Sequence, residues 1–261
     1  MDWAIALHET VYKTMTMRPD IDRPLDGGFR ANAFEPVLLE EPGSSLPVQM
    51  QLWLKRAIDL SLGGMALILS LPVWIVITVS IKTTSKGPIF FRQKRVGKDG
   101  VPFEIYKFRT MVHHAAAEDH KAYIKQLLKD GDPTEEERAR LMAAYIEYVH
   151  GKVTQVGRFL RASSLDELPQ LINIVKGEMS LVGPRPHPTY EVKEYKDWYH
   201  RRHTVKTGLT GWSKINLRLT PQNYEEAIQY DLWYVDHWSL ALDIKIIIKT
   251  IPFILFNRDA R

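Results

Sequence analysis

One long stretch without a charged side chain limits what this chain can fold into. It runs from Leu60 to Ile81 and is mostly aliphatic. A helix rises about 1.5 Å per residue, so this run is long enough to reach across a hydrocarbon core of about 30 Å. A buried core helix is the alternative, but an uncharged run of this length is more typical of membrane contact. The run therefore predicts a membrane-associated helix.

Two details of this run argue against a simple membrane crossing. Pro72 lies near its middle, where proline bends or breaks a helix, and Ser70 can satisfy a carbonyl group that the proline leaves free. Basic residues stand on both flanks: Lys55 and Arg56 before the run, and Lys82, Lys86, Arg92, Lys94 and Arg95 after it. Because Lys and Arg collect on the cytoplasmic side of spanning helices, we expect both ends to face the cytoplasm. The sequence favours a re-entrant helix hairpin with its membrane break at Ser70 and Pro72, and a spanning helix is the alternative.

The rest of the chain has the composition of an ordinary folded protein. Hydrophobic residues make up 45% and charged residues 25% of it, and the net charge of +4 does not point to nucleic acid as a partner. It contains no cysteine, which excludes disulfides and thiolate metal sites. We expect a loosely ordered N-terminal extension without a signal peptide over 1–50, because prolines crowd this region, a membrane-inserted helix over 51–86, and a folded domain over 87–261.

A small β-hairpin is predicted directly after the apolar run. Ile89–Arg92 and Phe103–Phe108 have the composition of short strands, and the pair Asp99-Gly100 between them is a turn signal. Its basic side chains form either a solvated face near anionic lipid or a cradle for a phosphate group. Candidates for the phosphate cradle are Arg92, Arg95, Lys107 and Arg109, whereas Lys98 fits a solvated face.

Two polar helices are predicted in the middle of the chain, over Ala115–Leu128 and Thr134–His150. We interpret them as a surface segment that carries no catalytic residues. His113, His114 and His120 raise the question of a metal site, but adjacent histidines do not share a helix face, so bystander residues are the preferred interpretation.

The C-terminal region has an amphipathic pattern. Ile244, Ile247, Ile248 and Ile251 line one face of a predicted helix, Lys245 and Lys249 lie on another, and Trp233, Tyr234 and Trp238 stand upstream. Such a helix either lies in the membrane interface or packs in an ordinary core, and the pattern does not separate the two.

An adjacent pair of carboxylates, Asp166 and Glu167, stands in the stretch SSLDELPQL. Ser164 and Glu167 have the spacing of a capping box, so the plain interpretation is the first turn of a helix that ends at Gly177. Catalysis is the alternative. Arg161 precedes the pair, and Arg185 lies between two prolines in GPRPHP, where a rigid arginine is suited to grip a phosphate group.

Several long motifs resemble, in the correct order, the bacterial sugar transferases known as monotopic phosphoglycosyl transferases. These motifs are GPIFFRQKRVG, YKFRTM, VGRFLRASSLDELPQLINIVKGEMSLVGPRP and GLTGW, and the similarity runs from about Lys55 to the C-terminus. The resemblance implies a short-form member with an α+β fold. This fold is a mostly helical membrane-associated domain with a re-entrant helix hairpin, a small β-hairpin and interfacial amphipathic helices. The family often has Ser-Pro at the membrane break, where this chain has Ser70-Leu71-Pro72.

The resemblance also implies a reaction. Family members transfer a sugar 1-phosphate from a UDP-sugar to undecaprenyl phosphate, release UMP, and start exopolysaccharide or other surface glycan biosynthesis. The matching positions imply Asp166 as nucleophile and ligand of Mg²⁺, and Glu167 as general base. Arg161 would contact the polyprenyl phosphate and Arg185 the nucleotide phosphate.

The implied location is the bacterial inner membrane, in contact with its lipids and with the catalytic domain on the cytoplasmic face. A homodimer is compatible with this interpretation.

Electrostatics agrees with these implied roles. A pyrophosphate repels an attacking carboxylate, so Mg²⁺ and arginines must neutralise its charge. Covalent capture then divides one difficult step into two easier ones. Two alternatives stay open: direct attack of the lipid phosphate on the donor, with Asp166 only holding Mg²⁺, and a non-enzymatic membrane scaffold for glycan assembly. The scaffold gives Arg161 and Arg185 no reason to accompany the acids.

Overall fold

The computed structural model describes residues 46–112, 151–217 and 224–256, together with single positions between 134 and 147. Nearly all of the predicted N-terminal extension lies outside these residues. The same holds for most of the two predicted polar helices and for His113, His114 and His120.

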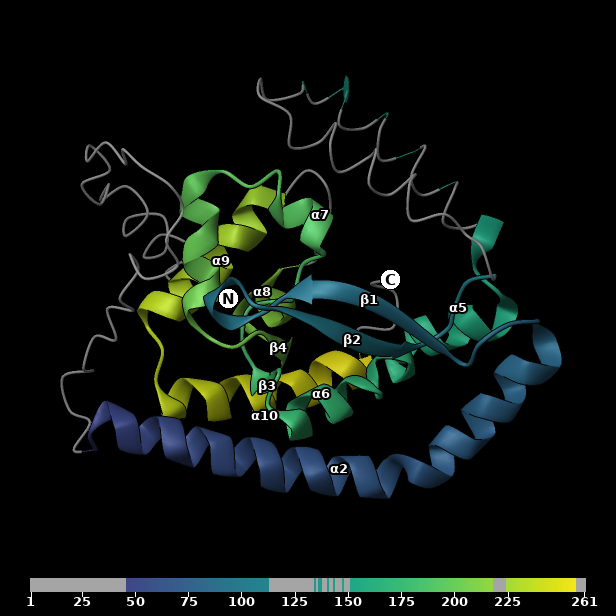
Figure 1. Ribbon diagram of the computed structural model, residues 1–261, viewed down its shortest axis with the longest axis horizontal. Coiled ribbons are helices and arrows are strands. Elements are labelled where there is room, and N and C mark those ends of the chain that lie inside the picture. Colours follow the sequence, from purple (N-terminus) through teal and green to yellow (C-terminus); the bar gives the residue numbers. More distant parts are fainter. Residues whose placement is uncertain are drawn as a thin grey trace. The chain divides into compact units, whose positions relative to one another are not determined.

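Helix α2, Val48–Thr84, contains the whole apolar run. Pro72 lies inside it, and the Ser70 hydroxyl nearby donates to the Leu67 carbonyl at 2.9 Å and accepts from the Trp74 indole at 3.1 Å. The helix changes direction near its middle (Figure 1), as expected where proline removes a backbone hydrogen bond. It is thus one continuous bent helix, and its re-entrant placement in a membrane stays a prediction.

Both ends of α2 contact the folded part of the chain that follows it. Near the start, the Lys55 ammonium pairs with Asp243 at 2.6 Å. Near the end, Ile77 and Ile81 are buried in a cluster with Phe108. Between these contacts many large apolar side chains are exposed, among them Met65, Ile68, Leu69, Ile75 and Val76. Within the described residues, α2 is the helix whose length and composition would allow it to cross a membrane.

The predicted β-hairpin is confirmed. Strand β1, Phe90–Val96, pairs antiparallel with β2, Pro102–Phe108, and the pairing extends beyond the predicted first strand, Ile89–Arg92. A short 3-10 turn, η2 at Lys98–Gly100, joins them, and Asp99 has a φ of 57° there. Asp and Gly tolerate such left-handed backbone, which explains why this pair forms the turn.

A second two-stranded sheet was not predicted. Strand β3, Ser180–Val182, runs parallel to β4, Gly208–Thr210. Two glycines permit this approach, because a Cβ atom at Gly208 would lie 2.1 Å from the backbone nitrogen of Gly183. The sheet therefore brings together the GPRPHP loop and the GLTGW loop, which are far apart in the sequence.

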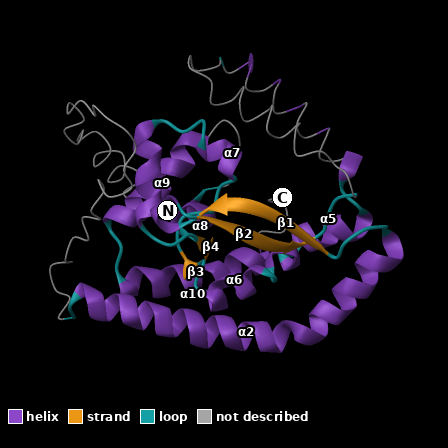
Figure 2. Cartoon of the chain, viewed as in Figure 1, coloured by secondary structure: helices purple, strands orange, loops and turns teal. Residues whose placement is uncertain are grey.

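The remaining elements are helical, as predicted for most of the domain, and Figure 2 shows the two small sheets among them. These elements are α5 (Gln155–Ala162), η3 (Leu165–Glu167), α6 (Gln170–Lys176), α7 (Thr189–Val192), η4 (Asp197–Thr204), α8 (Trp212–Asn216), α9 (Tyr224–Asp236) and α10 (Leu240–Phe256). Helices α6 and α10 both pack against α2 (Figure 1).

Helix α10 is divided between the core and the surface. Ile246 is fully buried with Tyr234 and Trp238, so the upstream aromatic residues belong to a core rather than to a membrane interface. Ile248 and Ile251, in contrast, are 62% and 58% exposed. Core packing is thus confirmed for one face of this helix, and contact of its exposed apolar strip with the membrane interface stays a prediction.

Candidate active site

The two adjacent acids lie on η3, a 3-10 turn separate from the helix that follows. Pro169 precedes the first residue of α6 and has no backbone N–H, so a regular helix does not continue through it. The prediction of a single helix from the acids to Gly177 is wrong at its start. Its end is confirmed, because Gly177 has a φ of 86° and its N–H caps the last turn.

The predicted capping box is also wrong. Ser164 has a φ of 59°, and its side chain makes no capping hydrogen bond. Glu167, which would complete the box, is engaged elsewhere. Its carboxylate oxygens lie 3.2 Å from the Lys107 ammonium and 2.6 Å from the Lys214 ammonium. The acids therefore stand in the first turn of η3 without forming a capping box.

Three segments that are distant in the sequence form this group of Glu167 and its two lysines. Lys107 comes from β2, Glu167 from η3 and Lys214 from α8. Of these, Lys107 was a predicted phosphate-binding residue, whereas Lys214 was missed. A signal existed, because Lys214 closely follows the GLTGW motif, but no short-range pattern links it to the acids.

Charges determine the protonation of this cluster. Burial alone would raise the pKa of Glu167, but the charges of Lys214, Lys107 and Arg185 together lower it well below its usual value. Burial lowers the pKa of Lys107, and the charges of Glu167 and Asp166 oppose that effect. Glu167 is therefore ionised at neutral pH and is a weak proton acceptor.

Asp166 is the more buried of the two acids, with 8% of its surface exposed. It lies close enough to Lys107 to raise the pKa of that ammonium. Arg161 stands near the end of α5, directly before the turn that carries the acids, and its Nε donates to the Thr110 hydroxyl at 2.9 Å. The structure therefore places Asp166 beside the Lys107 ammonium, one turn after the helix that carries Arg161.

Arg185 is exposed on a loop whose flanking residues, Pro184 and Pro186, are buried. Its charge acts on both Glu167 and Lys107, so it belongs to the same cluster. Arg95 holds this loop by donating from Nη1 to the Pro186 carbonyl at 2.8 Å. Burial, helped by the charge of Arg185, lowers the pKa of Arg95 to about 10.

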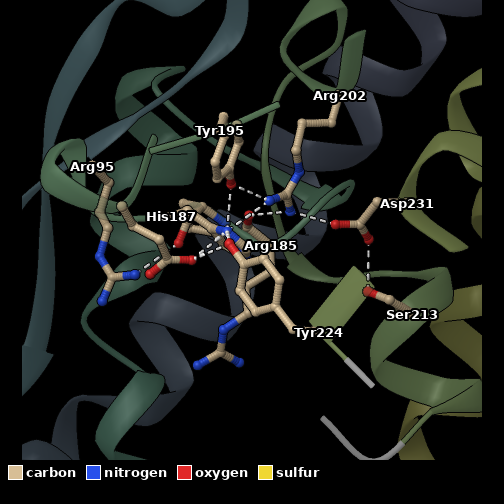
Figure 3. Close-up of polar contacts among 10 residues, drawn as sticks. Arg95, Arg185, His187, Tyr195, Arg202, Ser213, Tyr224 and Asp231 are labelled. Atoms are coloured by element: carbon tan, nitrogen blue, oxygen red, sulfur yellow. Dashed lines mark hydrogen bonds and ion pairs between the residues drawn. The ribbon is translucent and has the colours of Figure 1, made fainter. Parts of the chain in front are cut away.

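A buried polar network lies behind the Arg185 loop (Figure 3). At its centre Arg202, 1% exposed, donates to the Arg185 carbonyl at 2.7 Å and forms an ion pair with Asp231. The other Asp231 oxygen accepts from the Ser213 hydroxyl at 2.6 Å. Asp231 therefore connects the loop that carries Arg185 with α8, which carries Ser213 and Lys214. Sequence reasoning missed this network.

His187 completes the network from the other side of Arg202. Its Nδ1 lies 2.8 Å from Arg202 Nη1 and accepts from that group in the tautomer that carries the proton on Nε2, because a guanidinium group can only donate. Burial and the charge of Arg202 lower the pKa of His187 to about 4, so the ring is neutral at pH 7. Glu191 lies 2.6 Å from the same nitrogen and accepts from the Tyr224 hydroxyl at 2.7 Å.

Two predicted phosphate-binding residues are not brought to the acids. Arg92 is exposed on the hairpin, 5.4 Å from the centre of the Tyr106 ring. Arg109 is buried and donates to the backbone carbonyls of Ser85 and Lys86, both at 2.9 Å. It thereby fixes the end of α2, and the structure accounts for both arginines without a substrate.

The acids fit one kind of metal site and not another. No group of three or more His, Asp or Glu side chains gathers within the described part of the chain. The Glu167 carboxylate already forms ion pairs with Lys107 and Lys214. Magnesium is commonly held by one or two carboxylates together with substrate phosphates. The donor set therefore fits Mg²⁺ held by Asp166 and a phosphorylated substrate, and it does not fit a cage built by the protein alone.

Comparison with known proteins gives consistent matches. The sequence model of one family, described as bacterial sugar transferase, matches residues 50–257. A UDP-glucose:undecaprenyl-phosphate glucose-1-phosphate transferase of Klebsiella pneumoniae is 39% identical over 213 residues, which cover 79% of this chain and 41% of that protein. A protein of the same name from Caulobacter vibrioides is 35% identical, covering 92% of this chain and 82% of the relative.

The sugar in the relatives' names varies. An undecaprenyl-phosphate galactose phosphotransferase of Salmonella typhimurium is 36% identical over 85% of this chain and 44% of that protein. The chain spans about two fifths of the length of the first curated relatives that it matches.

Proposed function

Because the chain belongs to the bacterial sugar transferase family, we propose that it transfers a sugar 1-phosphate from a UDP-sugar to undecaprenyl phosphate and releases UMP. The names of its relatives support this donor and this acceptor. One observation carries the proposal: buried Asp166 lies beside a carboxylate held by two lysines, close to the Arg185 loop. Such a reaction would be the first membrane step of exopolysaccharide or other surface glycan biosynthesis.

Asp166 is the proposed nucleophile. Lys107 and Arg185 neutralise the donor diphosphate, which lets the carboxylate approach it. A carboxylate oxygen of Asp166 attacks the phosphorus that bears the sugar, the bond from this phosphorus to the bridging oxygen breaks, and UMP leaves. An oxygen of undecaprenyl phosphate, held by Arg161, then attacks the same phosphorus. The bond to Asp166 breaks and the free carboxylate is restored.

Magnesium is proposed as the cofactor. Asp166 would hold it together with the phosphates of the donor, where it supplies charge neutralisation in addition to that of the basic side chains.

Glu167 is proposed to position the lysines. The resemblance implies a general base at this position, but its lowered pKa makes it a poor proton acceptor. Neither step needs one, because both attacking groups, a carboxylate and a phosphate monoester, are already ionised near pH 7. Holding Lys107 and Lys214 next to Asp166 is the role that the contacts support.

Location at the cytoplasmic face of the bacterial inner membrane is part of the proposal. Exposed apolar residues cover the middle of α2, while both of its ends contact the same folded unit. These features support a helix that enters the lipid, bends at Pro72 and returns to the same side. Such an anchor would keep the acids near the interface, where a water-soluble donor meets a lipid acceptor.

Intact-mass measurement tests the covalent step. Purified protein is incubated with Mg²⁺ and a panel of UDP-sugars without lipid acceptor. We expect one phosphosugar adduct with wild-type protein and none with Asp166→Asn. UMP release that requires the acceptor and leaves no adduct would favour direct attack by the lipid phosphate. No UMP release with any donor, even with acceptor present, would favour the scaffold.

A further inference from the structure

A lysine outside the predicted set lies at the centre of the proposed active site. Lys214, on α8, donates to Glu167 Oε2 at 2.6 Å and to the Leu209 carbonyl at 3.1 Å. Its side chain is only 17% exposed. Both contacts restrict the flexible side chain before any substrate arrives, so less conformational entropy is lost when a ligand binds.

Lys214 has binding capacity left after these contacts. An ammonium group has three N–H donors, and within the described residues two of them have partners. The cluster also has an excess of positive charge among the described residues, because the three cations Lys107, Lys214 and Arg185 act on Glu167, and Asp166 is the other acid beside Lys107. A largely buried ammonium group with a remaining N–H donor, in a cluster of net positive charge, is suited to bind an anion.

The position of Lys214 is coupled to that of Arg185. Ser213, the residue before Lys214, bonds to Asp231, and Asp231 pairs with Arg202, which holds the Arg185 carbonyl. Figure 3 shows this chain of contacts, with the dashed lines meeting Arg185 at its backbone. The backbone segments that carry the two cations therefore share one buried support, which suits the recognition of a ligand with two linked phosphates.

Building on the proposed function, we propose that Lys214 binds the diphosphate of the nucleotide-sugar donor. Glu167 and Leu209 position its ammonium, and the remaining N–H contacts a phosphate oxygen while Arg185 contacts the diphosphate from the opposite loop. Lys214 is thus a specificity residue for diphosphate over unphosphorylated nucleoside.

Calorimetric titration of the purified protein with UDP tests this proposal. We expect Lys214→Gln to weaken UDP binding about tenfold or more, as for the loss of one charge-assisted hydrogen bond. It should also raise KM for the UDP-sugar, while the weak affinity for uridine, measured by NMR, stays unchanged because uridine has no phosphate. Lys214→Arg keeps the charge and should retain most of the UDP affinity.

Lys176→Gln is the matched control. Lys176 is an exposed lysine on α6 that bonds to the Tyr106 hydroxyl at 3.2 Å, away from the acids, so this variant should bind UDP like the wild type. Wild-type UDP affinity in Lys214→Gln would overturn the proposal, and so would an equal loss for UDP and uridine. If Lys214→Gln does not fold, a Lys214→Arg variant that is folded but loses UDP binding tenfold would also overturn it.

The titration also separates this inference from the proposed function. If the wild type binds UDP but releases no UMP from any donor, the transfer reaction is wrong, and the comparison of UDP affinities still decides the role of Lys214. A wild-type protein that does not bind UDP would overturn both.

Discussion

Adjacent residues in this protein have different environments. Asp166 is buried, whereas Glu167 bridges two lysines from other segments. Successive residues on a 3-10 turn point in directions about 120° apart, so neighbours in sequence need not share partners. This separation gives the two carboxylates distinct proposed roles, one for chemistry and one for positioning cations.

His187 gives a prediction at the scale of a single residue. Its pKa is lowered from 6.5 to about 4, so the unfolded chain binds more protons than the folded one between these values. The free energy of unfolding should therefore fall as pH decreases from 6.5 to 4. In His187→Gln this slope should be smaller by up to about 1.4 kcal/mol per pH unit, measured by chemical unfolding in detergent.

Exposed His237 lies outside this network, so His237→Gln serves as the control variant in the same measurement. An unchanged slope in His187→Gln would show that His187 is not held neutral by the network.

The sequence predicted those residues of the candidate site that stand in recognisable motifs. The acids and the proline-flanked arginine stand in recognisable stretches, and the structure places Asp166, Glu167 and Arg185 in one cluster. Lys214 and Arg202 could not be found in this way, because their partners come from distant segments. Arg92 and Arg109 show the reverse, since basic residues near a motif can serve folding or lie in solvent.

Elements could be predicted where local chemistry determines them. The Asp99-Gly100 turn correctly indicated the β-hairpin, and Gly177 correctly indicated a helix end. The β3–β4 sheet was not predicted, because three-residue strands carry too little pattern and parallel pairing joins distant segments. The helical spacing of the leucines wrongly predicted that the acids belong to the helix that ends at Gly177. Pro169 separates η3, which carries the acids, from α6.

The connection between the Arg185 loop and α8 gives a prediction at the scale of elements. Asp231→Asn removes the charge that compensates buried Arg202, and breaking such a pair costs about 3 kcal/mol. We therefore expect a loss of that order in the free energy of unfolding, together with slower UMP release because Arg185 and Lys214 lose their common support.

Helix α9 contains its own control for this variant. Asp236 pairs with Arg201, and these side chains are 35% and 37% exposed. Breaking an exposed pair costs only about 0–1 kcal/mol, so Asp236→Asn should be nearly neutral. Equal destabilisation by the two variants would contradict a special role for Asp231.

The whole molecule gives a prediction about membrane topology. The chain has no cysteine, so single cysteines can be introduced at exposed Gln49 and Lys86, beyond the two ends of the apolar run. In sealed vesicles, a membrane-impermeant maleimide should label Gln49→Cys and Lys86→Cys from the same side, because both ends of α2 contact one folded unit. Labelling from opposite sides would establish a spanning helix instead.

The close contact between Gly183 and Gly208 has a consequence for the distance between the Arg185 loop and α8. The two backbones meet where no side chain fits, and the chain continues from them to Arg185 in one direction and to Lys214 in the other. An added methyl group at either glycine would push these segments apart. Gly183→Ala or Gly208→Ala should therefore displace the Arg185 loop from α8 and weaken the binding of UDP, the nucleotide portion of the proposed donor, in the same calorimetric titration.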